Sequence, residues 1–206
     1  MNSEYIDSCD KKSFQFISNL DEHIFLLMKC QVVCLDAFLH NLCEFPNTYY
    51  LEIGTWKGST LCSAMNENNV FFGIDNFSQF GNVRTIFYEN FNKFKGINSY
   101  FIECDCFQLN LNSLNYTFNV FFFDGDHTFE AHTRSLVYFY DVLDNEFVFI
   151  VDDWNWETVR EGTLKSIELC NLKIVYKKEI LTDENTRDKE YFWNGVCIFI
   201  LIKQLV

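Results

Sequence analysis

Two continuous apolar segments, each followed directly by acidic residues, constrain this chain more than any other feature of its sequence. Asn119–Phe123 leads into Asp124-Gly125-Asp126-His127, and Phe147–Val151 leads into Asp152-Asp153. Apolar runs of this length are typical of strands that are covered on both faces, as in parallel sheets. If the two strands are neighbours, their four aspartates converge at the carboxyl edge of the sheet, where α/β proteins bind ligands.

Carboxylates that lie this close repel one another unless a positive charge stands between them. Hard divalent cations such as Mg²⁺ prefer oxygen ligands of this kind. The alternative is that each aspartate caps the helix that follows its strand. A single aspartate after one strand would favour a cap, whereas two clusters with the same layout favour a bound cation.

Strand-like and helix-like segments alternate along most of the chain, which predicts a parallel sheet with right-handed crossovers and helices on both faces. The last two strand-like segments are joined without a convincing helix and should be antiparallel. We therefore expect a Rossmann-like α/β fold with seven strands in the order 3-2-1-4-5-7-6, strand 7 being antiparallel. The expected strands are 49–53, 70–74, 99–103, 119–123, 147–151, 172–176 and 196–202, and the expected helices are 59–66, 83–94, 129–143 and 158–169.

The length of 206 residues suits one domain with a helical appendage. We expect an N-terminal helical extension or cap at 1–45 and the main domain at 46–206. Residues 1–19 are polar and are expected to be loosely held, whereas apolar positions recur at helical spacing from Leu20 to Leu42. Pro46 ends that segment.

The net charge of −13 argues against non-specific nucleic-acid binding and against an anionic membrane surface as a partner. No apolar segment approaches the about 20 residues of a membrane-spanning helix. The N-terminus lacks the basic and apolar regions of a signal peptide. The odd number of cysteines, spread through apparent core segments, predicts buried thiols in a reducing compartment, and we expect a cytoplasmic protein.

A glycine-containing loop follows the first expected strand, within the segment Glu52-Ile53-Gly54-Thr55-Trp56-Lys57-Gly58-Ser59-Thr60. Its glycines permit a tight turn and a close approach to a ligand, and Ser59 or Thr60 is expected to cap the next helix. The spacing is neither G-x-G-x-x-G nor that of a P-loop. The second strand leads into Asp75, which is suited to accept hydrogen bonds from ribose hydroxyls or, alternatively, to form a turn. Asp105 follows the third strand and offers a polar contact at the same edge.

The order of these motifs resembles the class I S-adenosylmethionine-dependent methyltransferases over roughly residues 45–206. Glu-x-Gly-x-x-x-Gly at 52–58 looks like their motif I, which wraps the methionine part of the cofactor. The resemblance implies that Asp75 holds the ribose, that Asp105 lies near the adenine, and that the antiparallel last strand is the reversed seventh strand of the family. The cofactor-binding residues expected from it are Glu52, Gly54, Thr55, Gly58, Ser59, Asp75, Asp105 and Asp124.

The two aspartate clusters are similar to those of metal-dependent O-methyltransferases that act on sugar and aminocoumarin hydroxyls. More distantly, they resemble the catechol and caffeoyl-CoA O-methyltransferases. This resemblance implies that Asp124, Asp152 and Asp153 hold magnesium. The catalytic base stays open between Asp126, whose position is the base in the first group, and His127, which stands where the catechol enzymes have lysine.

We therefore expect a magnesium-dependent O-methyltransferase whose partner is a small-molecule acceptor, either a sugar or a phenol or catechol. The alternatives are a metal-independent methyltransferase, a non-catalytic S-adenosylmethionine-binding partner protein, and an NAD-linked oxidoreductase, which the absence of G-x-G-x-x-G disfavours. Trp154 and Trp156 either line the acceptor pocket or pack beneath a loop, and Arg160 either binds an acidic substrate group or forms a surface ion pair. The sequence is compatible with a homo-oligomer but specifies neither the acceptor nor the oligomeric state.

Overall fold

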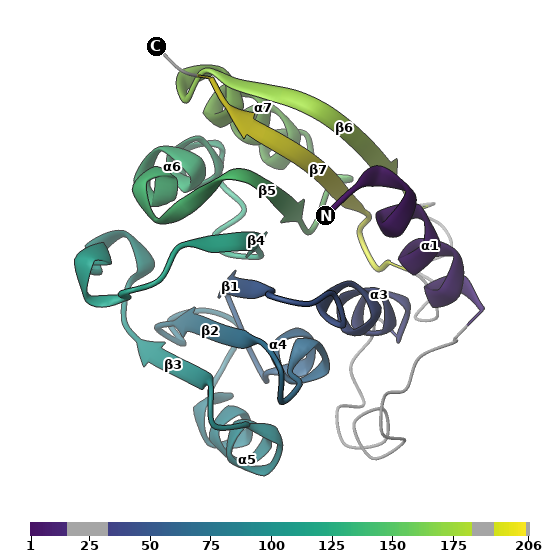
Figure 1. Ribbon diagram of the computed structural model, residues 1–206. Coiled ribbons are helices and arrows are strands. Elements are labelled where there is room, and N and C mark those ends of the chain that lie inside the picture. Colours follow the sequence, from purple (N-terminus) through teal and green to yellow (C-terminus); the bar gives the residue numbers. More distant parts are fainter. Residues whose placement is uncertain (16–32, 183–191, 205–206) are drawn as a thin grey trace.

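A seven-stranded mixed sheet forms the centre of the molecule in the computed structural model, which describes residues 1–15, 33–182 and 192–204 (Figure 1). The strands follow the order β3-β2-β1-β4-β5-β7-β6, and β7 is antiparallel to both of its neighbours while the other pairs are parallel. The predicted order and the predicted reversal are confirmed. The strands are β1 (Tyr49–Ile53), β2 (Val70–Asp75), β3 (Ser99–Glu103), β4 (Phe118–Phe123), β5 (Leu143–Val151), β6 (Leu172–Ile180) and β7 (Val196–Lys203).

Helices cover both faces of the sheet and create two separate cores (Figure 1). On one face lie α1 (Ser3–Phe14), α3 (Val33–Cys43), α4 (Ser59–Ala64) and α5 (Arg84–Phe94); on the other lie α6 (Phe129–Phe139) and α7 (Glu157–Leu169). Successive strand residues point to opposite faces, so Phe122 packs in the first core while Phe121 and Phe123 pack in the second. This is why the phenylalanine-rich strand β4 is apolar along nearly its whole length.

The three central strands end level with one another, and this alignment builds the candidate site. Ile53 is paired with Phe123, and Phe123 is paired with Val151. Hydrogen bonds continue one step past the strands, from Asp124 N to Ile53 O at 2.8 Å and from Asp152 N to Phe123 O at 3.3 Å. The glycine loop and both aspartate clusters therefore emerge side by side.

The N-terminal residues depart from the expectation that 1–19 are loosely held. Ser3–Phe14 is a helix whose N-cap, Asn2, accepts a hydrogen bond from Tyr5 N, and Ile6 and Cys9 are buried. Lys178 of β6 pairs with Asp7 at 3.0 Å. A tertiary ion pair and two buried apolar side chains thus hold α1 in place, although its polar composition predicted a loosely held segment. Helix α3 overlaps the predicted helical segment 20–42 and ends one residue beyond it, at Cys43; residues 20–32 of that segment lie outside the described residues.

Smaller differences concern the ends of elements. The helix expected over 129–143 stops at Phe139, because Leu143 already pairs with Phe118 as the first residue of β5. The described cysteines are all free, and most are buried. Within the described ranges, none of the helices combines the length and apolar character needed to cross a membrane.

Candidate active site

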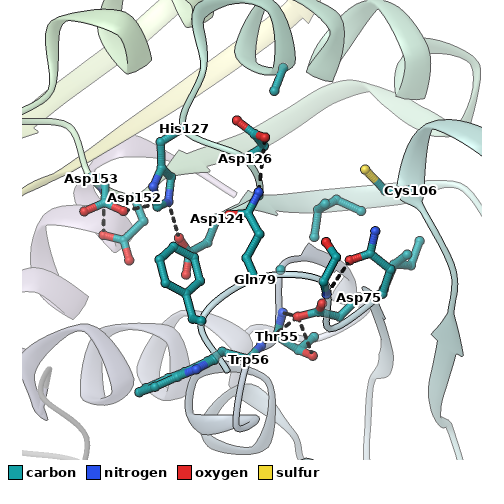
Figure 2. A pocket seen from close by; sticks show the side chains of 18 of the residues that line it. Thr55, Trp56, Asp75, Gln79, Cys106, Asp124, Asp126, His127, Asp152 and Asp153 are labelled. Carbon is teal, nitrogen blue, oxygen red and sulfur yellow. Dashed lines mark hydrogen bonds and ion pairs between the residues drawn. The ribbon is translucent and has the colours of Figure 1, made fainter. Parts of the chain in front are cut away.

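A cavity of about 750 Å³ opens at the carboxyl edge of the sheet, a size typical of small-molecule sites. In Figure 2, Asp75 and Cys106 lie at one end of it and Asp152 and Asp153 at the other, with Gln79 and Asp124 between them. The predicted site residues that line the cavity are Gly54, Thr55, Ser59, Asp75, Asp105, Asp124, Asp126, His127, Asp152 and Asp153. Two other predicted cofactor residues, Glu52 and Gly58, are not part of its wall.

The two glycines of the loop are required by its geometry. Gly54 has φ +85°, and a Cβ there would lie 1.8 Å from the carbonyl oxygen of Asp124, so only glycine lets the loop pass this close to the end of β4. Gly58 has φ +87° and is itself the N-cap of α4. The expectation that Ser59 or Thr60 caps this helix is therefore wrong, because both hydroxyl groups bond to buried carboxylates instead.

Glu52 supports the loop from beneath. It is fully buried, and it accepts hydrogen bonds of 2.6 Å each from the hydroxyls of Tyr50 and Thr60. Burial raises the pKa of Glu52 to about 8, although these hydrogen bonds lower it. Its carboxyl group therefore ties β1 to the start of α4.

Asp75 locks the glycine loop onto the end of β2. Its Oδ2 accepts the backbone N–H groups of Thr55 and Trp56, both at 2.8 Å, and its Oδ1 accepts that of Phe77 at 2.7 Å. The hydrogen bond from Phe77 N forms the turn that was expected as the alternative role of Asp75. A carboxylate offers about four acceptor positions, so Oδ1 retains one for a ligand hydroxyl. Ribose binding stays a prediction.

Asp105 begins a short 3-10 helix, η1 (Cys106–Gln108), and accepts a hydrogen bond from Phe107 N at 2.9 Å. Arg134 of α6 lies 4.2 Å above the ring of Phe107. Asp105, Phe107 and Arg134 all line the cavity at the β3 side, the part to which the resemblance assigns the adenine.

Asp124, His127 and Asp153 form a compact cluster at the ends of β4 and β5. His127 Nε2 lies 2.9 Å from Asp153 Oδ2 and 3.6 Å from Asp124 Oδ1. One possible ligand atom from each of the three residues lies within 4.8 Å of the others. Asp152 lines the same cavity but does not belong to this group, in which His127 takes its place.

Burial raises the pKa values of two aspartates at this edge of the sheet, whereas their neighbours raise that of His127. Burial raises the pKa of Asp124 to about 6 against the lowering effect of the His127 hydrogen bond. Burial, and then the charges of Asp124 and Asp153, raise the pKa of Asp152 well above its ordinary value. Burial alone would lower the pKa of His127, but the two neighbouring carboxylates raise it to about 10. The cluster is therefore a place where positive charge is strongly favoured.

The helix-cap alternative for the aspartates is wrong. Helix α6 is capped by Thr128, whose side chain accepts a hydrogen bond from Ala131 N, and the N-cap position of α7 is Trp156. Asp126 instead accepts hydrogen bonds from Thr128 N at 2.9 Å and from Gln79 Nε2 at 3.2 Å. Against the effect of burial, these bonds lower its pKa.

Comparison with known proteins identifies the family. A family model described as a methyltransferase domain matches residues 51–154, half of the chain, from β1 to the second aspartate cluster. This chain belongs to the class I S-adenosylmethionine-dependent methyltransferases. No curated protein sequence matches it.

Many solved structures share the fold of this methyltransferase, and two of them illustrate the likeness. An O-methyltransferase from Bacillus cereus in complex with SAH has a TM-score of 0.66 at 12% identity, covering 96% of this chain and 100% of that one. The SAH-bound methyltransferase PaMTH1 from Podospora anserina has a TM-score of 0.63 at 11% identity, covering 100% and 97% respectively. At these identities the likeness concerns the fold alone.

The two tryptophans after β5 have different surroundings in this methyltransferase. Trp154 is fully buried, and its Nε1 donates to Glu179 at 2.7 Å, so it is a packing residue. Trp156 is 42% exposed, lines the cavity and meets the ring of His127 edge-on at 4.6 Å. The guanidinium of Arg160 donates to the carbonyl oxygens of Trp154 and Asn155, and Arg160 is not among the residues that line the cavity.

Among the polar residues of the cavity that sequence reasoning missed, three make hydrogen bonds to the predicted site residues. Asn194, just before β7, donates to Asp153 Oδ1 at 2.6 Å; Gln79 of the β2–α5 loop holds Asp126; and Asp36 of α3 bonds to Ser59. None of them follows a motif. Asn194 and Asp36 reach the cavity from segments far from their partners in the sequence, and Gln79 meets Asp126 across 47 positions, contacts that no local sequence signal reveals.

Proposed function

We propose that this methyltransferase transfers the methyl group of S-adenosylmethionine to a hydroxyl oxygen of a small-molecule acceptor, with the help of a divalent cation. The observation that carries the proposal is the Asp124–His127–Asp153 cluster, which lies in the same cavity as the glycine loop. The bound cofactor and the acceptor would thus lie next to each other at the ends of β1, β4 and β5.

The cavity supports an extended cofactor pose. Asp105 and Asp75 would face its adenosine part, and Gly54 and Thr55 would lie against its methionine part. Thr55 is only 2% exposed and is held by Asp75, so this surface is rigid before any ligand arrives. Glu52 would act by supporting the loop, since it does not line the cavity.

The donor set suits a divalent cation. Asp124 and Asp153 offer carboxylate oxygens, Asp152 lies beside them, and His127 offers a ring nitrogen. When bound, such an ion orients an acceptor hydroxyl and lowers its pKa. All-oxygen ligation would favour Mg²⁺, whereas ligation by His127 would extend the range to Mn²⁺ and similar ions.

Of the two candidate bases, the geometry favours His127. Asp126 already accepts two hydrogen bonds and has a lowered pKa, so it is a weak proton acceptor. His127 lies within the cluster and is oriented by Asp153. We propose that the carboxylates would hold the cation and that His127, once their charge is offset, receives the acceptor proton; bound to the cation through Nε2, His127 would have no free lone pair for that proton.

Aromatic side chains flank this position and support a ring-shaped acceptor. The exposed ring of Phe80 lies 6.0 Å from that of His127, and Trp156 meets the same imidazole from another element. Flat phenolic rings and the apolar faces of sugars both pack on such surfaces.

The test is methyl transfer from isotopically labelled S-adenosylmethionine to a panel of catechols, phenols and sugars, before and after chelation. We expect transfer to a hydroxyl acceptor that is lost in EDTA and restored by Mg²⁺ or Mn²⁺. Asp153→Asn should abolish it. The control is Asp144→Asn, an exposed aspartate at the opposite end of β5. Full turnover in EDTA would refute the metal-dependent mechanism.

One observation favours a second candidate, a metal-independent methyltransferase. His127 bridges Asp124 and Asp153 and, when protonated, can itself supply the counter-charge. In that case His127→Gln should lower the free energy of unfolding most below pH 6.5, the deficit relative to the wild type should shrink as the pH rises towards 10, and turnover should be insensitive to chelation. Loss of turnover in EDTA excludes this alternative.

A further inference from the structure

Asp36 of helix α3 is a buried carboxylate on the cavity wall with one unused oxygen. The residue is 5% exposed and lines the cavity next to Ser59. Ser59 Oγ donates to Asp36 Oδ2 at 2.8 Å. Asp36 Oδ1 is buried and has no hydrogen-bond partner among the described residues. A buried carboxylate oxygen without a donor is costly, so this position calls for a ligand.

Among the described residues, the cavity wall supplies no cation to Asp36. Of the positively charged groups that line it, His127 is held by Asp124 and Asp153, and Arg134 lies over Phe107 at the β3 side. Burial raises the pKa of Asp36 to about 7, against the lowering effect of the Ser59 hydrogen bond. The missing partner is therefore a donor that a bound molecule brings.

We propose that Asp36 accepts a hydrogen bond from the α-ammonium group of the cofactor's amino-acid part. This inference rests on the proposed cofactor pose and adds to it a recognition residue from outside the glycine loop. It also gives the N-terminal extension a function, since α3 then helps to select the cofactor.

The chemistry of the cofactor singles out this group. Its ribose and adenine belong to the distant Asp75 and Asp105 end of the cavity. Its carboxylate would be repelled by Asp36, and its sulfonium has no hydrogen to donate. The ammonium is positively charged, carries three N–H donors and belongs to the part of the cofactor that lies against Gly54 and Thr55. Ser59, which follows this loop, holds Asp36 in place.

The test is a binding cycle that compares S-adenosylhomocysteine with its analogue lacking the α-amino group, using calorimetry on the wild type and on Asp36→Asn. This substitution keeps the shape of the side chain and removes its charge. Because hydrogen bonds to charged groups are the stronger kind, the wild type should prefer S-adenosylhomocysteine by about 10- to 100-fold. Asp36→Asn should reduce that preference to less than about 3-fold, which is less than one hydrogen bond to a charged group contributes.

The matched control is Asp10→Asn, another 5% exposed aspartate of the N-terminal extension, which pairs with Lys178 and does not line the cavity. It should leave the preference unchanged. An unchanged preference in Asp36→Asn refutes the inference while the proposed cofactor pose stands. A wild type without any preference refutes it even if Asp36→Asn does not fold. If the wild type binds neither compound, the proposed function itself fails.

Discussion

Replacing Glu52 by glutamine should make this methyltransferase more stable at neutral pH, although Glu52 belongs to its glycine-loop motif. The side chain is fully buried, and burial raises the pKa of Glu52 from an ordinary 4.5 to about 8. A carboxyl group with a raised folded-state pKa contributes full stability below pH 4.5 and loses that contribution as the pH rises towards 8. Glutamine keeps the shape and has no proton to lose.

The magnitude follows from the linkage between pKa and stability. Each pH unit between the unfolded and folded pKa values is worth about 1.36 kcal/mol. Relative to the wild type, Glu52→Gln should therefore gain about 3 kcal/mol of unfolding free energy between pH 4.5 and 7, and about 5 kcal/mol by pH 8. The hydroxyls of Tyr50 and Thr60 can rotate to serve the amide, so no partner is lost.

The assay is urea unfolding of both proteins, followed by circular dichroism at half-unit pH steps from 4.5 to 8.5 in the presence of EDTA. Glu67→Gln, an exposed glutamate in the turn before β2, controls for the change in net charge. A stability difference between Glu52→Gln and the wild type that does not grow with pH would refute the reasoning, because it would mean that Glu52 ionises normally in its buried position.

Three further perturbations test other parts of the structure. Gly54→Ala should cost more than about 2 kcal/mol in urea unfolding, because φ is left-handed and the added Cβ meets the Asp124 carbonyl; a stable variant would contradict the loop geometry. Burial lowers the pKa of His132 to about 3. Below pH 6.5 the unfolding free energy of the wild type should therefore fall by about 1.4 kcal/mol per pH unit relative to that of His132→Gln. Parallel curves of unfolding free energy against pH would argue against a neutral buried imidazole. Asn194→Ala removes the side chain that donates a hydrogen bond to Asp153. The affinity for Mn²⁺, measured by electron paramagnetic resonance titration, should fall about 10-fold. An unchanged affinity would exclude a role of Asn194 in positioning Asp153.

The topology could be predicted from the sequence because both of its determinants are local. Apolar runs such as Phe147–Val151 mark strands covered on two faces, and helical segments between strands impose parallel crossovers. The lack of a convincing helical sequence pattern between the last two strands then predicts the reversal, which the pairing of β7 with β5 and β6 confirms. Prediction failed at α1, where Lys178 and two buried apolar side chains stabilise a helix of polar composition.

The candidate site was predictable where its residues directly follow strands. Gly54, Asp75, Asp124 and Asp153 line one cavity because parallel strands deliver their carboxyl ends to the same edge. The grouping within that edge was not predictable. His127, rather than Asp152, joins Asp124 and Asp153, since side-chain direction after a strand depends on how each loop turns.

The sequence by itself determined the order of the strands, the reversal of the last one and the acidic edge, because hydrophobic periodicity and strand-end residues are short-range properties of the chain. Only the tertiary structure decided which groups meet at that edge. Asn194 reaches Asp153 across 41 positions, and Asp36 reaches Ser59 across 23. Contacts over such separations depend on how helices and loops pack against the sheet. That packing depends on the side chains of the whole core together, because protein interiors are close-packed.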